Sequence, residues 1–271
     1  MKDQTIFQLS EAEDISNVGG KAYALGRLIR AGFQVPDGFV LSSNAPDNIG
    51  SELSRFLLSR FDELGARFVA VRSSAINEDS NDAAWAGQLE TYLNCRKEEL
   101  IQRVVECRNS INAERAQSYA RQKGIEATKV AVLVQAMVDS EISGVAFSAH
   151  PVSGDINTLV IEAGFGLGEA IVSGQVTPDT YVLHKADGQI IEKHVANQEK
   201  MLARNNVGIT VWQDVGMNKG KQKLSDEQVV GVLEVTKKIE VFYGYPVDVE
   251  WAIYKDKLYI LQSRPITTIA S

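Results

Sequence analysis

Residues 246–265 read PVDVEWAIYKDKLYILQSRP, and this stretch decides the fold more clearly than any other. Polar and apolar residues alternate on both sides of a short charged loop, which is typical of two antiparallel strands. If Glu250 lies opposite Gln262, then Asp248 lies opposite Arg264 and the loop is Lys255-Asp256-Lys257. The four polar residues then share one face. The other face holds the apolar residues Val249, Trp251, Ile253, Tyr259 and Leu261.

The polar face of this hairpin has the composition of a site for a magnesium-bound nucleotide. Glu250 and Gln262 supply oxygen atoms of the kind that Mg²⁺ binds, and Arg264 is a cation suited to phosphate. The alternative is a solvent-facing polar surface with an ion pair between Asp248 and Arg264. A shift of one residue would separate these groups, so the expectation depends on the register.

The remainder of the chain mixes helices and strands without a regular alternation. Four helices are expected, over residues 21–31, 52–64, 98–123 and 225–242. Strands are expected over residues 38–41, 68–71, 130–138, 144–148, 158–163, 181–185 and 190–195. This order predicts an α+β fold and argues against a Rossmann-type sheet. We expect two lobes, residues 1–137 and 138–271, with a hinge near Gln135–Asp139.

Composition limits the classes of protein that fit. The 271 residues are 44% hydrophobic and 23% charged with a formal charge of −7, which argues against a general nucleic-acid surface. Two cysteines, Cys95 and Cys107, are too few for a disulfide scaffold. The first residues lack a signal-peptide pattern and no apolar run is long enough to span a bilayer. We expect a soluble, cytoplasmic protein that does not bind membranes.

Two candidate phosphate-binding segments lie in the first half. Gly19-Gly20-Lys21 precedes a helix, where backbone N–H groups and Lys21 could meet a phosphate, although the Walker A spacing is absent. A simple turn is the alternative. Arg72 ends a buried strand and could bind phosphate or form a structural salt bridge. The segment Trp85–Gln88 with Thr91 could fold over a nucleotide or be an ordinary surface loop. Residues 164–169, GFGLGE, do not fit a dinucleotide fingerprint.

Short motifs in a fixed order give the sequence a resemblance. They are residues 18–22, 35–39, 71–75 with 78–79, 86–88, 91–93, 134–138, 143–148, 166–169, 176–179, 246–251 and 261–265. Together they resemble the ATP-grasp nucleotide-binding domain of the phosphoenolpyruvate synthase and pyruvate phosphate dikinase family, which includes rifamycin phosphotransferase. The resemblance covers nearly the whole chain and implies two lobes with the nucleotide between them.

The resemblance also implies roles for the residues that match. Three cations would hold the triphosphate and serve catalysis: Lys21, Arg72 and Arg264. Two residues would lie in the covering loop, Gly87 and Thr91, and two on the strand that binds adenine, Gln135 and Met137. Mg²⁺ would be held by Glu250 and Gln262, and Gln262 would also lie against the nucleotide.

In this family ATP is split into AMP and phosphate, and a phosphoryl group passes to a histidine on a swivelling domain and then to an acceptor. The Thr-Ser-His signature of that domain is absent, since the histidines are His150, His184 and His194. The phosphohistidine and acceptor-binding domains are therefore expected on other chains or outside this sequence. The segment from about Asn44 to Arg67 is also short for the family, which bears on how a histidine domain docks. Alternatives are a rifamycin-type ATP domain, a non-catalytic ATP-binding module, and a ligase that releases ADP.

Overall fold

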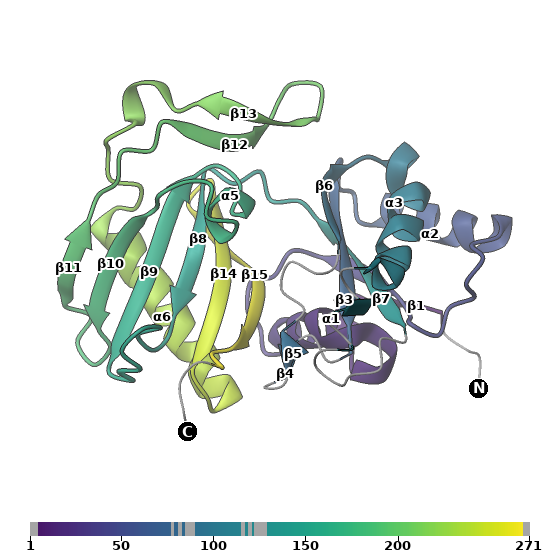
Figure 1. Cartoon of the computed structure of the whole chain (residues 1–271), viewed down its shortest axis with the longest axis horizontal. Helices are drawn as coiled ribbons and strands as arrows, with labels where there is room; N and C mark the ends of the chain where they lie inside the picture. The colour runs from purple at the N-terminus through teal and green to yellow at the C-terminus, as the bar shows by residue number, and fades with distance from the viewer. Residues whose placement is uncertain are drawn as a thin grey trace. The chain divides into compact units, whose positions relative to one another are not determined.

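The computed structural model describes residues 5–76, 79–80, 83–84, 90–114, 117–118, 121 and 129–267. The chain divides into two compact units, Met1–Met137 and Val138–Ser271 (Figure 1). Each unit is built on its own antiparallel sheet, so strands and helices are mixed in both. The predicted α+β class is confirmed. No helix among the described residues is long and apolar enough to cross a bilayer.

The first unit contains a five-stranded sheet in the order β1-β2-β7-β3-β6. Its strands are β1 (Ile6–Gln8), β2 (Gly38–Leu41), β3 (Val69–Ala75), β6 (Thr91–Cys95) and β7 (Val130–Ala136). Its helices are α1 (Ile15–Arg30), α2 (Ser51–Glu63) and α3 (Leu100–Asn109). Shorter pieces are η1 (Leu9–Glu11), β4 (Asp79–Ser80), β5 (Ala83–Ala84), η2 (Lys97–Glu99) and η3 (Ser110–Asn112).

Alternation along β3 and β7 sorts the helices of this unit onto two faces. Val69 and Val71 join a buried cluster with Leu57 of α2 and Val104 of α3. The intervening side chains point to the opposite face, where Ser74 Oγ accepts a hydrogen bond from the backbone of α1. Arg72 is in phase with Ser74 and therefore lies on the α1 face. The apolar alternation thus buries one side of the sheet and brings polar groups to the other.

Helix α3 is shorter than the sequence predicted. An uninterrupted helix over residues 98–123 is wrong, because α3 ends at Asn109 and a 3-10 turn follows at Ser110–Asn112. The Ser110 hydroxyl donates to the Cys107 carbonyl oxygen at 2.7 Å and also contacts Ser73 Oγ at 3.2 Å. Serine competes for helix backbone groups in this way, and here it also fixes the helix end against β3.

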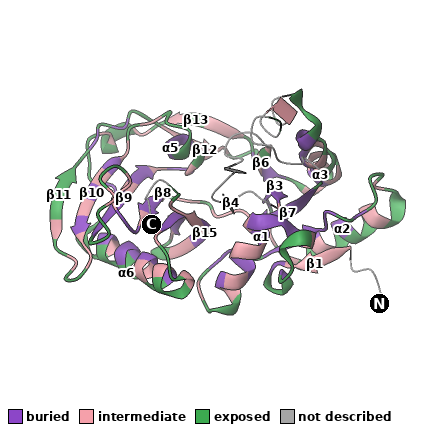
Figure 2. Ribbon diagram, turned by 60° about the horizontal axis from the view of Figure 1, so that its bottom comes forward, coloured by how far each residue is buried: buried purple, intermediate pink, exposed green. Residues whose placement is uncertain are grey.

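The second unit contains a six-stranded sheet in the order β11-β10-β9-β8-β14-β15. The strands are β8 (Ile142–Phe147), β9 (Thr158–Phe165), β10 (Asp179–His184), β11 (Ile190–His194), β14 (Val247–Tyr254) and β15 (Lys257–Pro265). Helix α6 (Asp226–Tyr243) begins at the predicted capping box on Ser225 and packs against β8, β9 and β14. The inner strands are largely buried, whereas the edge strand β11 is exposed (Figure 2).

A second, two-stranded sheet in this unit was not predicted. Strands β12 (Lys200–Arg204) and β13 (Thr210–Asp214) form a separate hairpin. The Leu167 amide, which precedes the short helix α5 (Glu169–Val172), donates to the Leu202 carbonyl oxygen at 2.8 Å. Gly166 has a φ of 87° and leaves no room for a side chain against that same carbonyl. A glycine is therefore required where the hairpin meets the six-stranded sheet.

The C-terminal hairpin has the predicted register at its open end and a different one near its turn. Asp248 pairs with Arg264 and Glu250 with Gln262, as expected. A bulge between Glu250 and Trp251 then moves Ile260 opposite Trp251. The expected three-residue loop and uniform register are wrong, because the loop is a two-residue turn with positive φ at Lys255 and Asp256. Such turns match strand twist, and the bulge absorbs the extra residue.

Candidate functional site

In the first unit, a break inside α1 brings Lys21 to the end of β3. Gly19 has a φ of 74° and a ψ of 169°, so the helix stops there and restarts. A side chain at Gly19 would collide with the Ser74 carbonyl oxygen. Beyond the break, the Ala22 amide donates to Ser74 Oγ at 3.2 Å and Lys21 Nζ donates to the Ser73 carbonyl oxygen at 3.3 Å. The restarted helix therefore presents a new N-terminus beside a lysine, as a phosphate site requires.

Arg72 lies on the same face of the sheet, next to two other predicted site residues. Its Nη1 donates to Gln135 Oε1 at 3.5 Å, and its strand partner on β6 is Thr91. Gln135 is only 3% exposed, and its Nε2 donates to the Pro36 carbonyl oxygen at 3.4 Å. The structure thus brings Arg72, Gln135 and Thr91 together. Gly87, the other residue predicted for the covering loop, lies outside the described residues.

Met137 follows the last residue of β7, and its backbone is already engaged within the first unit. The Met137 amide donates to the Phe68 carbonyl oxygen at 3.0 Å, and the preceding Ala136 amide donates to the Asp37 carbonyl oxygen at 2.8 Å. A ligand at this strand end would therefore meet the Met137 carbonyl group rather than its N–H. The sequence indicated the position but could not show which backbone group is available.

In the second unit, the polar face of the hairpin is assembled as predicted. Arg264 Nε and Asp248 Oδ2 form an ion pair at 2.8 Å. Asp248 is only 7% exposed, and its other oxygen, Oδ1, has no hydrogen-bond partner among the described residues. Burial raises the pKa of Asp248, while Arg264 opposes that rise. The carboxylate of this pair is buried and the Arg264 side chain is 32% exposed, so the pair faces solvent only on its cationic side.

The sequence missed Glu162, which stands on the same face. Glu250 pairs with Val145 on β8, and Val145 pairs with Glu162 on β9, so the two glutamates lie in one row with Val145 between them. Burial raises the pKa of Glu162, and the nearby carboxylate of Asp248 raises it further. A glutamate inside an otherwise apolar buried strand was the available signal. Its alignment with Glu250 depends on strands far apart in sequence.

The oxygen donors of this face are suited to magnesium held jointly with a ligand. The described part of the chain has no group of three or more His, Cys, Asp or Glu residues placed to hold a metal ion. The face offers instead one carboxylate beside one amide, Glu250 and Gln262, together with the unpartnered buried oxygen of Asp248. Mg²⁺ is commonly bound by one or two carboxylates and completed by phosphate oxygens and water. The residues therefore fit that ion.

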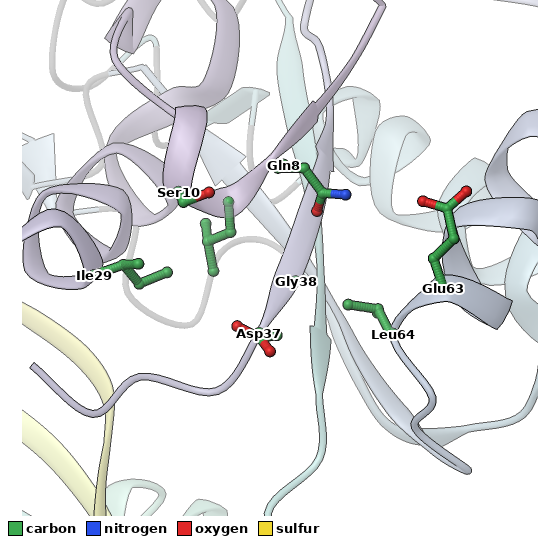
Figure 3. A pocket seen from close by; sticks show the side chains of 8 residues that line it. Gln8, Ser10, Ile29, Asp37, Gly38, Glu63 and Leu64 are labelled. Carbon is green, nitrogen blue, oxygen red and sulfur yellow. The ribbon is translucent and has the colours of Figure 1, made fainter. Parts of the chain in front are cut away.

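A cavity in the first unit lies elsewhere. It has a volume of about 280 Å³ and lies between η1, β2 and the end of α2 (Figure 3). Its lining consists of Gln8, Leu9, Ser10, Ile29, Asp37, Gly38, Glu63 and Leu64. The charged members, Asp37 and Glu63, are acids that would repel a triphosphate. None of the predicted site residues lines this cavity.

The chain is similar to proteins of one known family. The fold is of the α+β class expected from the sequence. The chain belongs to the family described as pyruvate phosphate dikinase, AMP/ATP-binding domain, which residues 40–271 match. The resemblance drawn from the sequence motifs is therefore confirmed.

Individual relatives extend the comparison. The chain is 39% identical to the uncharacterized phosphotransferase YvkC of Bacillus subtilis, over 96% of this chain and 34% of YvkC. It is 44% identical to the phosphoenolpyruvate synthase of Pyrococcus furiosus, over 81% of this chain and 29% of that protein. A solved D-alanine–D-alanine ligase from Helicobacter pylori is 11% identical with a TM-score of 0.43, over 94% of this chain and 56% of that one. The chain thus spans about a third of the length of YvkC and of the Pyrococcus furiosus protein.

Proposed function

We propose that this chain is the Mg-ATP-binding part of a dikinase-type phosphotransferase, which splits ATP into AMP and phosphate and phosphorylates a histidine on another domain or chain. Membership of the AMP/ATP-binding family and the name of the Pyrococcus furiosus relative support this assignment. The observation that carries it is a set of two cross-strand pairs, Asp248 with Arg264 and Glu250 with Gln262. These pairs bring oxygen ligands and a cation together on one half-buried face.

Within the first unit, Lys21 and Arg72 are proposed to hold phosphate oxygens. The restarted helix at Gly19 adds backbone N–H groups to the Lys21 charge. Gln135 accepts from Arg72 and thereby fixes the direction of its guanidinium group. Thr91, opposite Arg72, would contact the same phosphates together with Gly87 of the covering loop. The Met137 carbonyl would accept a hydrogen bond from the adenine amine.

Within the second unit, Glu250 and Gln262 are proposed to hold Mg²⁺, which would neutralise phosphate charge when bound. Asp248 Oδ2 accepts a hydrogen bond from Arg264 Nε, which fixes the plane of the guanidinium group. A planar group fixed in this way is suited to two phosphate oxygens at once. Lys21, Arg72 and Arg264 would then stabilise the charge that develops during phosphoryl transfer.

Calorimetric titration with ATP and Mg²⁺ tests the binding half of this proposal. Arg264→Ala and Glu250→Ala should each weaken ATP binding at least tenfold, because each removes a charged contact. Lys193→Ala is the matched control, since Lys193 is a cation of similar exposure on β11 that pairs with Asp226. Unchanged ATP affinity in both site variants would contradict the assignment of these residues.

Product analysis tests the catalytic half. The chain is mixed with ATP, Mg²⁺ and a separately expressed phosphohistidine domain from a phosphoenolpyruvate synthase. AMP and phosphate should form only in the complete mixture, and the partner histidine should become labelled from β-labelled ATP. ADP as the nucleotide product would indicate a ligase or simple kinase. Binding without any AMP, whatever partner is added, would indicate a non-catalytic module.

A further inference from the structure

Ser73, near the end of β3, has backbone contacts with two parts of the candidate site in the first unit. Its carbonyl oxygen accepts a hydrogen bond from Lys21 Nζ at 3.3 Å. Its amide donates to the Glu90 carbonyl oxygen at 3.1 Å. Glu90 directly precedes Thr91, which is the strand partner of Arg72. A displacement of Ser73 would therefore move the groups around Arg72 and Lys21 together.

The side chain of Ser73 lies on the opposite face of the sheet, where the end of α3 holds it. Its hydroxyl oxygen is 3.1 Å from the Cys107 carbonyl oxygen and 3.2 Å from Ser110 Oγ. Ser110 donates to the same carbonyl oxygen at 2.7 Å. All three residues are buried, so the two hydroxyls and the carbonyl satisfy one another within the protein. A satisfied polar group in a core favours one packing arrangement over others.

The Cys107 thiol adds a second connection between α3 and the strands. Its Sγ donates to the Val71 carbonyl oxygen at 3.4 Å and to the Glu90 carbonyl oxygen at 3.7 Å. Burial raises the pKa of this thiol to about 12, so it stays protonated and can act as a weak donor. The end of α3 thus contacts both residues that flank Arg72, namely Val71 and Ser73.

The contacts from α3 lie beside an irregularity in the sheet. Strand β3 runs between β7 and β6, but its pairing with β6 shifts register between Val69 and Val71. A register shift leaves a residue outside the ladder and bends the strand locally. The contacts from Cys107 and Ser110 follow directly after this shift. They hold β3 where its own pairing is interrupted, immediately around Arg72.

We infer that Ser73 and Ser110 are positioning residues for phosphate binding, because their buried hydroxyls hold β3 against α3 and so place Arg72 and Lys21. This inference rests on the proposed function, which assigns Arg72 and Lys21 to the phosphates of ATP. Both hydroxyls lie on the face of the sheet opposite Arg72 and act through the strand. Recognition of the phosphates should therefore depend on the two serines, whereas recognition of adenosine should not.

Calorimetric titration with ATP and with adenosine, both in the presence of Mg²⁺, tests the inference. Ser73→Ala and Ser110→Ala should each weaken ATP binding about fivefold, the affinity equivalent of one neutral hydrogen bond, and change adenosine binding less than about twofold. Ser110→Thr keeps the hydroxyl and should bind ATP like the wild type. Thr236→Val is the control, because it removes a buried hydroxyl that donates to a helix carbonyl of α6 in the other unit. It should leave ATP affinity unchanged.

A double-mutant comparison distinguishes positioning from a general structural role. In the Arg72→Ala or the Lys21→Ala background, Ser73→Ala should weaken ATP binding less than it does in the wild type, because one of the groups it places is already missing. The full fivefold loss in both backgrounds would show that Ser73 acts independently of these cations, and would overturn the inference.

The remaining outcomes separate this inference from the proposed function. If the wild-type chain does not bind ATP, the proposed function fails and the inference with it. If the wild type binds ATP and both alanine variants bind it equally well, the inference alone is overturned. Equal weakening of ATP and adenosine would also overturn it, since general damage to the fold affects both ligands. Circular dichroism checks that each variant is folded; if neither alanine variant folds, Ser110→Thr decides, and a fivefold loss of ATP affinity there overturns the inference.

Discussion

In Met1–Met137 the predicted binding residues come from separate elements, whereas in Val138–Ser271 all of them come from one hairpin. The first set depends on close backbone contacts, such as Gly19 against Ser74. The second depends on strand register and on buried charge, as in the Asp248–Arg264 pair. We therefore expect an added side chain at a close contact to destabilise the first unit. Loss of one partner of a buried charge pair should destabilise the second unit.

The largest effect is expected at a buried ion pair of the second unit. Lys223 Nζ lies 2.7 Å from Asp179 Oδ1, and both side chains are fully buried. Tyr181 and the backbone amides of Ala196 and Lys223 donate to the same carboxylate. Lys223→Met should lower the free energy of unfolding by about 3–5 kcal/mol, because it leaves a buried carboxylate without its cation.

Urea denaturation measures this change, and a second variant shows its cause. Asp179→Asn combined with Lys223→Met should recover part of the lost stability, since no buried charge then remains. A double variant as unstable as the sum of the two single variants would show that packing, not charge, determines the loss.

The corresponding test in the first unit adds a single methyl group at Gly19. Gly19→Ala should lower the free energy of unfolding by about 3 kcal/mol, because it combines a positive φ with a collision against β3. Gly32→Ala is the control, with a φ of 84° and open space around it, and should cost about 1 kcal/mol. Equal losses by urea denaturation would mean that backbone conformation, and not contact with Ser74, determines the effect.

The two units also differ in how much of the candidate site the sequence could predict. The pairing of Glu250 with Gln262 could be derived from local alternation, since a hairpin brings together residues close in sequence. The bulge after Glu250 could not, because the choice of turn at Lys255–Asp256 depends on strand twist. The hydrogen bond from Arg72 to Gln135 joins residues 63 positions apart, so no local pattern could show it. For the same reason Glu162 was missed: its row is set by strands β8 and β9.

A smaller effect is expected at the pair within the candidate site. Arg264→Met leaves both oxygens of the mostly buried Asp248 without a cation, and should lower the free energy of unfolding by about 2 kcal/mol. Lys193→Met is the control, because the two cations are 32% and 30% exposed while their carboxylate partners are 10% and 65% exposed. The control should cost less than about 1 kcal/mol. Similar losses would show that burial of the acid does not matter.

The smallest effect is a pH dependence that distinguishes the two units. Burial raises the pKa of Glu162 in the folded chain, so the folded state holds its proton at pH values where the unfolded chain has released it. Stability therefore falls as the pH rises above the ordinary carboxyl range. Glu162→Gln removes this effect, so the variant should gain stability over the wild type at about pH 7 and not at about pH 4. In the first unit the groups with raised pKa values include Tyr92, Cys95 and Cys107, each at about 12, so the corresponding loss falls in the alkaline range. Urea denaturation at both acidic and neutral pH decides the matter: a difference between variant and wild type that is constant with pH would show that Glu162 is not desolvated in the folded chain.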